Sequence, residues 1–160
     1  MKSFHILLAG LAFAAAATPA QAQTSDVDKG ANAAKACGLD HDPDEAEFRA
    51  FAPAKRQAVM ACFQRQSALD MQPQLPQKVD GITTLRGVTA VGTQIRYDYV
   101  VDLDATAVTA EQRQSIEQNI RTKVCGSKDM AAVIRNGGSY AYRWEGRGAV
   151  LIHRMTVAAC

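Results

Sequence analysis

The cysteines of this sequence carry the chemistry that it predicts most clearly. Their number is even, they are far apart, and they lack the C-x-x-C spacing of a redox or zinc site. Such a set is typical of structural disulfides in small exported proteins. We predict the pairs Cys37–Cys62 and Cys125–Cys160 among the three that are possible, because each bond then closes a loop within one half of the chain.

The N-terminal segment predicts that these cysteines meet an oxidising environment. Lys2 precedes an apolar stretch over residues 6–17, which is too short to cross a bilayer, and residues 20–22 read Ala-Gln-Ala, a signal-peptide cleavage pattern. We expect cleavage after Ala22 and a periplasmic or secreted product. Leu11 stands where a bacterial lipoprotein would need a cysteine, so we expect no lipid anchor.

Composition and charge exclude several partners. The chain has 18 Lys and Arg against 16 Asp and Glu, a net charge of +2. This balance argues against a protein that tracks nucleic-acid phosphates. No apolar run after Ala22 approaches the roughly 20 residues of a membrane span. We therefore expect no nucleic acid, no cofactor and no stable membrane insertion.

Alternating aromatic residues give the strongest signal for binding. Tyr97 and Tyr99 alternate on one predicted strand, and Tyr140, Tyr142 and Trp144 alternate on another. If these strands are adjacent, their aromatic rings form one continuous surface. Most of that surface is expected to be core beneath helices, but aromatic side chains with polar tips also dominate protein interfaces. A carrier that holds a small ligand against this face is an alternative.

Charged residues accompany the aromatic set. Arg143 lies within it, and His153 shares strand parity with two apolar residues that we expect on the packed face, Leu151 and Met155. As a general base, His153 would also need an orienting acid and a nucleophile. The competing hypothesis is therefore a small hydrolase that acts on envelope polymers, and the simpler interpretation is a hydrogen-bonded structural histidine.

Carboxylate side chains are concentrated over residues 40–47, as they are in calcium sites. The spacing of this acidic run does not fit a calcium-binding loop, because Pro43 interrupts it and the turn glycine is missing. Acids at the start of a helix also favour the helix dipole. We therefore predict a helix here with Asp42 as its N-cap and Glu45 as the capping-box acid, and no metal site.

Sequence periodicity predicts the elements that position these residues. The helices are expected at 31–36, 43–52, 53–69, 109–124 and 127–135, and the strands at 82–91, 94–104, 140–144 and 151–157. The connector at 72–77 is rich in Pro and Gln. The predicted fold class is α+β, with an N-terminal helical hairpin followed by a two-layer ββααββ domain with an antiparallel sheet. The expected boundaries are a signal peptide at 1–22, a helical segment with its connector at 23–77, and the α+β domain at 78–160.

A set of scattered positions in the second half of the chain forms a recognisable pattern: Leu75-Pro76, Val79-Asp80, Thr84-Leu85, Tyr97, Tyr99, Cys125, Gly138, Tyr140, Tyr142, Gly148, Val157 and Cys160. On these positions, residues 75–160 resemble a small exported domain of uncharacterised proteobacterial envelope proteins. The resemblance implies a bacterial origin and supports the bond between Cys125 and Cys160, and it implies no activity. From the export signal and the aromatic residues we expect an exported, non-enzymatic protein that binds another protein of the cell envelope, such as a secretion component or an envelope enzyme that it restrains.

Overall fold

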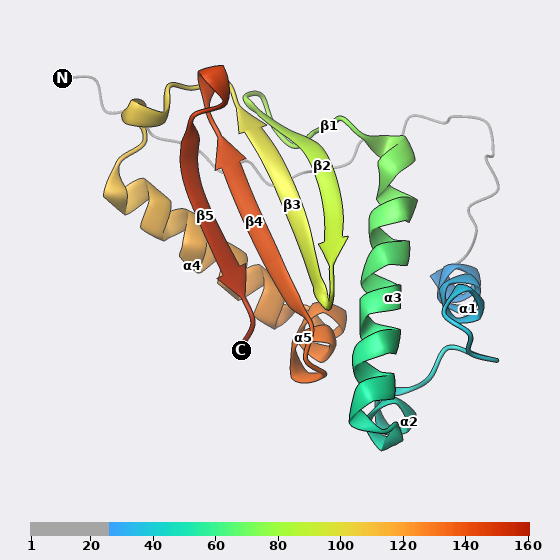
Figure 1. Ribbon diagram of the computed structural model, residues 1–160. Coiled ribbons are helices and arrows are strands. Elements are labelled where there is room, and N and C mark those ends of the chain that lie inside the picture. Colours follow the sequence, from blue (N-terminus) through green and yellow to red (C-terminus); the bar gives the residue numbers. More distant parts are fainter. Residues whose placement is uncertain (1–25) are drawn as a thin grey trace, which may run out of the picture.

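The computed structural model describes residues 26–160 and has an α+β fold (Figure 1). The predicted signal peptide and its cleavage site after Ala22 lie outside the described residues. The elements follow the chain in the order α1 (Asp26–Ala36), α2 (Glu45–Ala50), α3 (Pro53–Met71), the 3-10 helix η1 (Gln72–Gln74), β1 (Gln77–Lys78), β2 (Thr83–Val91), β3 (Gln94–Val101), η2 (Ala105–Ala107), α4 (Ala110–Gly126), α5 (Lys128–Arg135), β4 (Ser139–Glu145), η3 (Arg147–Ala149) and β5 (Leu151–Val157).

Capping residues explain where two of the helices begin. Thr109 and Gln112 form the capping box of α4, as the sequence predicts. The prediction for α2 is wrong by two residues, because Asp44 is the N-cap and Glu47 completes the box. Residues 42–45 and 44–47 both have the required Asp-x-x-Glu spacing, so local sequence does not choose between them. The observed start accompanies burial of Phe48 from α2.

The sheet has five strands in the order β1-β2-β3-β4-β5. Its strands pair antiparallel except for β3 and β4, which are parallel neighbours. The expectation of four strands that all pair antiparallel is therefore corrected in two respects. At the centre of the sheet β3 and β4 are parallel, and at one edge β1 adds a fifth strand. Helices α4 and α5 connect β3 to β4 and return the chain to the same end of the sheet, which a parallel pair requires. The edge strand β1 comes from the end of the Pro/Gln connector and the residue after it.

Helices α3 and α4 pack on one face of the sheet, and their side chains share its core. Ala68 from α3 and Val124 from α4 are buried in the same cluster as Val88, Ile95 and Val157 from the strands. Figure 1 shows α4 passing behind the strands, with no helix crossing in front of β2 to β5. Among the described residues, no helix therefore covers the second face of the sheet over these strands.

Strand β5 departs from the predicted alternation at its start. The pairing register shifts beside Trp144 and Glu145, so that Leu151 rather than Ile152 lies opposite Glu145. This irregularity buries Ile152 and leaves Leu151 44% exposed. The prediction that Leu151 lies on the packed face is wrong, whereas Met155 and Val157 do pack against the core.

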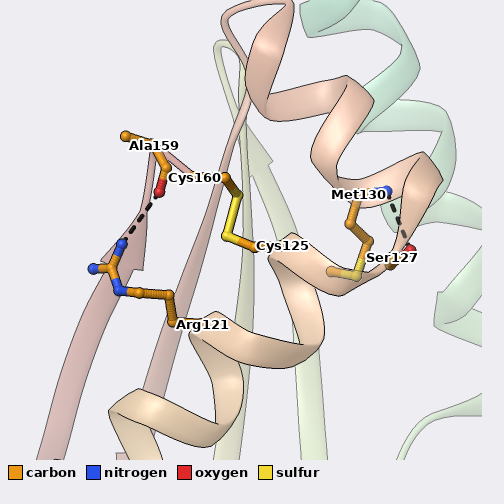
Figure 2. The surroundings of a disulfide bond; sticks show 6 residues. All are labelled: Arg121, Cys125, Ser127, Met130, Ala159 and Cys160. Carbon is orange, nitrogen blue, oxygen red and sulfur yellow. Dashed lines mark hydrogen bonds between the residues drawn. A yellow bond between two sulfur atoms is a disulfide. The ribbon is translucent and has the colours of Figure 1, made fainter.

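Two disulfides are present, and they are the predicted pairs. Cys37 at the end of α1 is bonded to Cys62 in α3, and Cys125 in α4 is bonded to Cys160. Beside the second bond, Arg121 donates a hydrogen bond to the carbonyl oxygen of Ala159 at 3.2 Å (Figure 2). These contacts fasten the C-terminal residues to α4. Among the described helices, none combines the length and the apolar character that crossing a membrane requires.

Candidate functional site

Three strands bring five ring-bearing side chains into one stack, which we call the aromatic ladder: Tyr97, Tyr99, Tyr142, Trp144 and His153. The parallel register places Tyr97 opposite Tyr142 and Tyr99 opposite Trp144. The ring centroids of these pairs are 5.4 Å and 5.6 Å apart, and the planes are nearly parallel. Trp144 also stacks on Tyr142 and on His153 from β5, with centroids 5.8 Å and 6.0 Å apart. The ladder therefore runs across the middle of the sheet.

Burial of the ladder side chains differs between strands β3 and β4. Tyr142 and Trp144 on β4 are 6% and 7% exposed, and Tyr140 beside them is equally buried at 7%. Tyr97 and Tyr99 on β3 are only partly buried. The part on β4 is thus core, as expected for most of the predicted surface, and the part on β3 reaches the surface.

Burial also changes the acidity of these tyrosines, which are all four tyrosines of the chain. Desolvation disfavours the phenolate and raises the pKa of Tyr99 to about 12. The same cause raises the pKa of Tyr97, Tyr140 and Tyr142 above the ordinary value, with neighbouring tyrosines adding to the rise in the last two. The ladder therefore presents neutral hydroxyl groups at any physiological pH.

His153 at the end of the ladder is paired with an acid that the sequence did not reveal. Its Nε2 atom lies 2.8 Å from Oε1 of Glu117 in α4, and its side chain is 17% exposed. The two groups are not aligned as a hydrogen bond, because buried Nε2 has no partner with acceptable geometry. The contact is therefore one of proximity rather than a directed hydrogen bond.

The hydrolase hypothesis requires a nucleophile beside His153, and the described residues provide none. Every described cysteine is in a disulfide. Within residues 26–160, the buried Nε2 atom of His153 has no hydrogen-bond partner, so no serine or threonine hydroxyl group is bonded to it. His153 thus has an acid nearby but neither a hydrogen-bonded orienting acid nor a hydrogen-bonded nucleophile at Nε2.

Arg143 does not join the aromatic ladder, although it lies between Tyr142 and Trp144 in sequence. Successive side chains of a strand point to opposite faces of the sheet, so Arg143 faces away from the helices. There it forms an ion pair with Glu145, and Glu145 also pairs with Arg86 at 2.9 Å. The predicted binding residues are therefore divided between the two faces.

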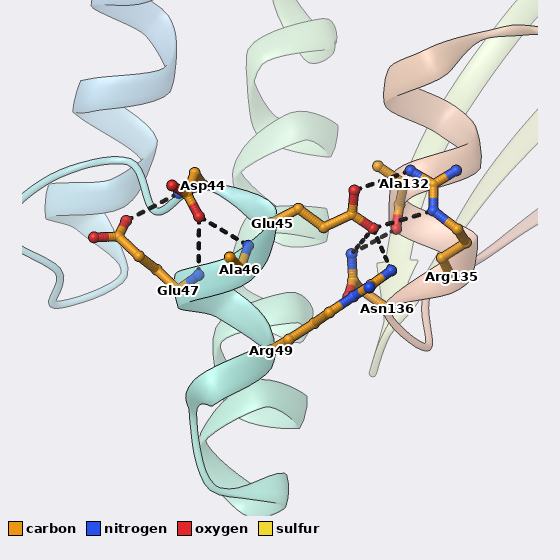
Figure 3. Close-up of polar contacts among 8 residues, drawn as sticks. All are labelled: Asp44, Glu45, Ala46, Glu47, Arg49, Ala132, Arg135 and Asn136. Carbon is orange, nitrogen blue, oxygen red and sulfur yellow. Dashed lines mark hydrogen bonds and ion pairs between the residues drawn. The ribbon is translucent and has the colours of Figure 1, made fainter.

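The acidic run is used for local structure. The side chain of Asp44 accepts hydrogen bonds from two backbone N–H groups, and Glu47 accepts one from the N–H of Asp44 (Figure 3). Glu45 pairs with Arg49 on its own helix and with Arg135 on α5, and these arginines lower its pKa. No group of three or more metal-binding side chains occurs in the described part of the chain.

A pocket of about 370 Å³ lies beside α2, and none of the ladder residues lines it. Its walls include Leu39, Pro43 and Phe51, with the Nζ atom of Lys55 lying 4.0 Å from the centroid of the Phe51 ring. The ligand-carrier alternative expected a pocket between helices and sheet, lined by Tyr140 or Trp144. The observed pocket is elsewhere, so it does not support a carrier that uses the aromatic face.

Comparisons with known proteins identify the fold. No family model matches the sequence, and no curated protein matches it. Among solved structures, the chain is similar to a protein from Pseudomonas aeruginosa described as secreted, with 12% identity and a TM-score of 0.58 over 64% of this chain and 92% of that one. It is also similar to the type II secretion pilotin EpsS of Vibrio vulnificus, with 15% identity and a TM-score of 0.57 over 66% of this chain and 94% of the pilotin.

A third similar structure is AspS of Vibrio cholerae, likewise a type II secretion pilotin. Identity is 20% and the TM-score is 0.55, over 67% of this chain and 95% of the pilotin. At these identities the similarity shows a shared fold. The described chain thus has the fold of secreted and secretion-related proteins, and its two disulfides are typical of proteins in oxidising compartments.

Proposed function

We propose that this protein is an exported, non-enzymatic protein of the bacterial cell envelope that binds another envelope or secretion-related protein. The observation that carries the proposal is the gradient of burial along the aromatic ladder. Trp144 is anchored in the core, whereas Tyr97 and Tyr99 remain partly exposed on the central strand β3. The partly exposed rings are held in place by the buried ones.

The surroundings of Tyr97 and Tyr99 suit a protein partner. Other partly buried apolar side chains of the same core lie on both flanking helices, including Met71 at the end of α3 and Ile116 and Ile120 on α4. Rigid aromatic residues next to apolar side chains contribute most of the energy in many protein interfaces. A partner that covers Tyr97 and Tyr99 would bury this apolar area and leave the hydroxyl groups for hydrogen bonds.

The fold supports the partner class. Two of the similar structures are pilotins of type II secretion systems, so we propose a component of a secretion apparatus as the first candidate partner. Export with cleavage after Ala22 would deliver the protein to the periplasm. His153 and Glu117 then have a structural role, which is to close the end of the ladder on β5.

Photo-crosslinking in living cells of the native host tests this proposal. A benzoylphenylalanine is placed at Tyr97 or at Tyr99, and the matched control is placed at Val91, which is 70% exposed at the end of β2. We expect a crosslinked envelope protein from the two ladder positions and none from Val91. The proposal is wrong if the ladder positions give no protein adduct, or if all three positions give the same adducts.

A further inference from the structure

The open face of the sheet carries one arginine on each of four adjacent strands, which we call the arginine face: Arg86, Arg96, Arg143 and Arg154. Side-chain exposures of 56%, 45% and 42% for the first three show that their guanidinium groups reach solvent. Arg154 is exposed as well. Neither α3 nor α4 covers this face, because both pack on the opposite one.

The arginine face has fewer acids than arginines. Glu145 pairs with Arg86 and Arg143, and Asp98 pairs with Arg96 at 3.1 Å. Arg154 has no ion-pair partner among the described residues. It lies directly opposite Arg143 in the pairing of β4 with β5. Like charges at directly opposite positions destabilise a sheet. The two carboxylates thus pair with three of the four guanidinium groups, and Arg143 and Arg154 remain as neighbouring like charges on a solvent-exposed face.

The two acids lie beneath the arginines rather than among them. Glu145 is 6% exposed, and the side chain of Asp98 is 15% exposed, with its Oδ1 atom buried and lacking a hydrogen-bond partner. An arginine has five N–H donors, and each of these ion pairs occupies only part of them. Glu145 and Asp98 therefore hold the paired guanidinium groups from the side nearer the sheet, and the N–H groups that face solvent keep fixed positions.

We propose that the arginine face binds an acidic segment of a partner protein, whose Asp and Glu carboxylates accept these outward N–H groups. The region around Arg143 and Arg154 is its centre, because a carboxylate placed between them relieves their repulsion. Gly87, in the same row of the sheet as Asp98, Arg143 and Arg154, has no side chain to obstruct an approaching segment. This surface is independent of the aromatic ladder and lies on the other face of the sheet.

The residue types favour a protein over an anionic membrane. The four basic residues of this face on β2 to β5 are arginines, whose planar fork matches individual carboxylates, and Asp98 and Glu145 hold three of them in place. Attraction to a lipid surface depends on net charge. The two embedded acids reduce that net charge, which opposes membrane binding but still permits directed bonds to carboxylates.

The test uses the mature, oxidised protein and a short fluorescein-labelled peptide of alternating glutamate and threonine. Fluorescence anisotropy measures its binding, and the same peptide with glutamine in place of glutamate is the reference. We expect only the glutamate peptide to bind, with affinity that falls as salt is raised. The variant Arg143→Gln/Arg154→Gln should weaken binding by at least about tenfold.

A charge-matched variant, Arg65→Gln/Lys123→Gln, removes two exposed positive charges from α3 and α4 and should bind the peptide as the wild type does. Chemical shifts of backbone amides in the wild-type protein provide a second measurement that needs no substitution, and we expect peptide-induced shifts on β4 and β5. Absence of binding, equal weakening by both variants, or shifts confined to another surface would overturn the proposal. Binding to vesicles of phosphatidylglycerol and phosphatidylcholine without binding to the peptide would also overturn it.

Discussion

Tyr99 and Trp144 stack across the parallel pair of strands at the centre of the sheet, with ring centroids 5.6 Å apart. This contact joins the two halves of the ββααββ unit, because one ring precedes α4 and α5 and the other follows them. Trp144 also contacts Tyr142 and His153, so a single indole links three strands. The stack makes Trp144 the anchor of the ladder.

Truncation of this anchor should lower stability substantially. Trp144 is 7% exposed, and Trp144→Ala removes its packing and leaves a cavity, so we expect a loss of about 3–5 kcal/mol in the free energy of unfolding. Urea denaturation followed by circular dichroism measures the loss. Val150→Ala is the control, because Val150 is 55% exposed and its truncation should cost less than about 0.5 kcal/mol. Equal losses for the two variants would show that the ladder is not packed as described.

The raised pKa values of the tyrosines predict that the free energy of unfolding falls at alkaline pH. Their pKa values are raised in the folded protein, to about 12 for Tyr99, while the unfolded chain ionises near the ordinary value of 10.0. The unfolded state therefore loses protons first as pH rises, so stability is complete below pH 10 and falls above it. Absorbance at the phenolate band should show no tyrosine titrating at its ordinary pKa before unfolding. A tyrosine that ionises there in the folded protein would contradict the observed burial.

The disulfides should each contribute strongly to stability. They close loops with sequence separations of 25 and 35 residues, and the chain-entropy estimate gives about 3–4 kcal/mol for each. We expect Cys37→Ser/Cys62→Ser and Cys125→Ser/Cys160→Ser each to lose this amount in urea denaturation. Peptide mapping without reduction should recover only the two observed linkages. A peptide that joins Cys37 or Cys62 to Cys125 or Cys160 would refute the pairing.

Periodicity was sufficient to predict most elements because their patterns are local. The capping pair Thr109 and Gln112 and the alternation of aromatic residues along the strands both depend on the backbone within a few residues. The parallel pairing of β3 with β4 was not predictable in this way, since no local pattern states which strands become neighbours. The start of α2 was ambiguous for another reason, because Asp42 and Asp44 both fit the capping pattern.

The site was only partly predictable. Alternation assigns Arg143 and Trp144 to opposite faces, yet their adjacency in sequence suggested one mixed surface. Glu117 is far from His153 in the chain, so only the packing of α4 against β5 reveals their contact. Leu151 escaped prediction because a register shift changed its face. The last two errors concern how separate elements meet, and local sequence carries little information on that.

The most direct test of the central claim is the affinity of the partner captured at Tyr97 and Tyr99, measured by calorimetry with purified proteins. We expect Tyr97→Ala/Tyr99→Ala to weaken binding at least about tenfold, while Val91→Ala leaves the affinity unchanged and both variants remain folded. Unchanged affinity in the folded tyrosine variant would contradict the claim that this protein binds its partner through the aromatic ladder.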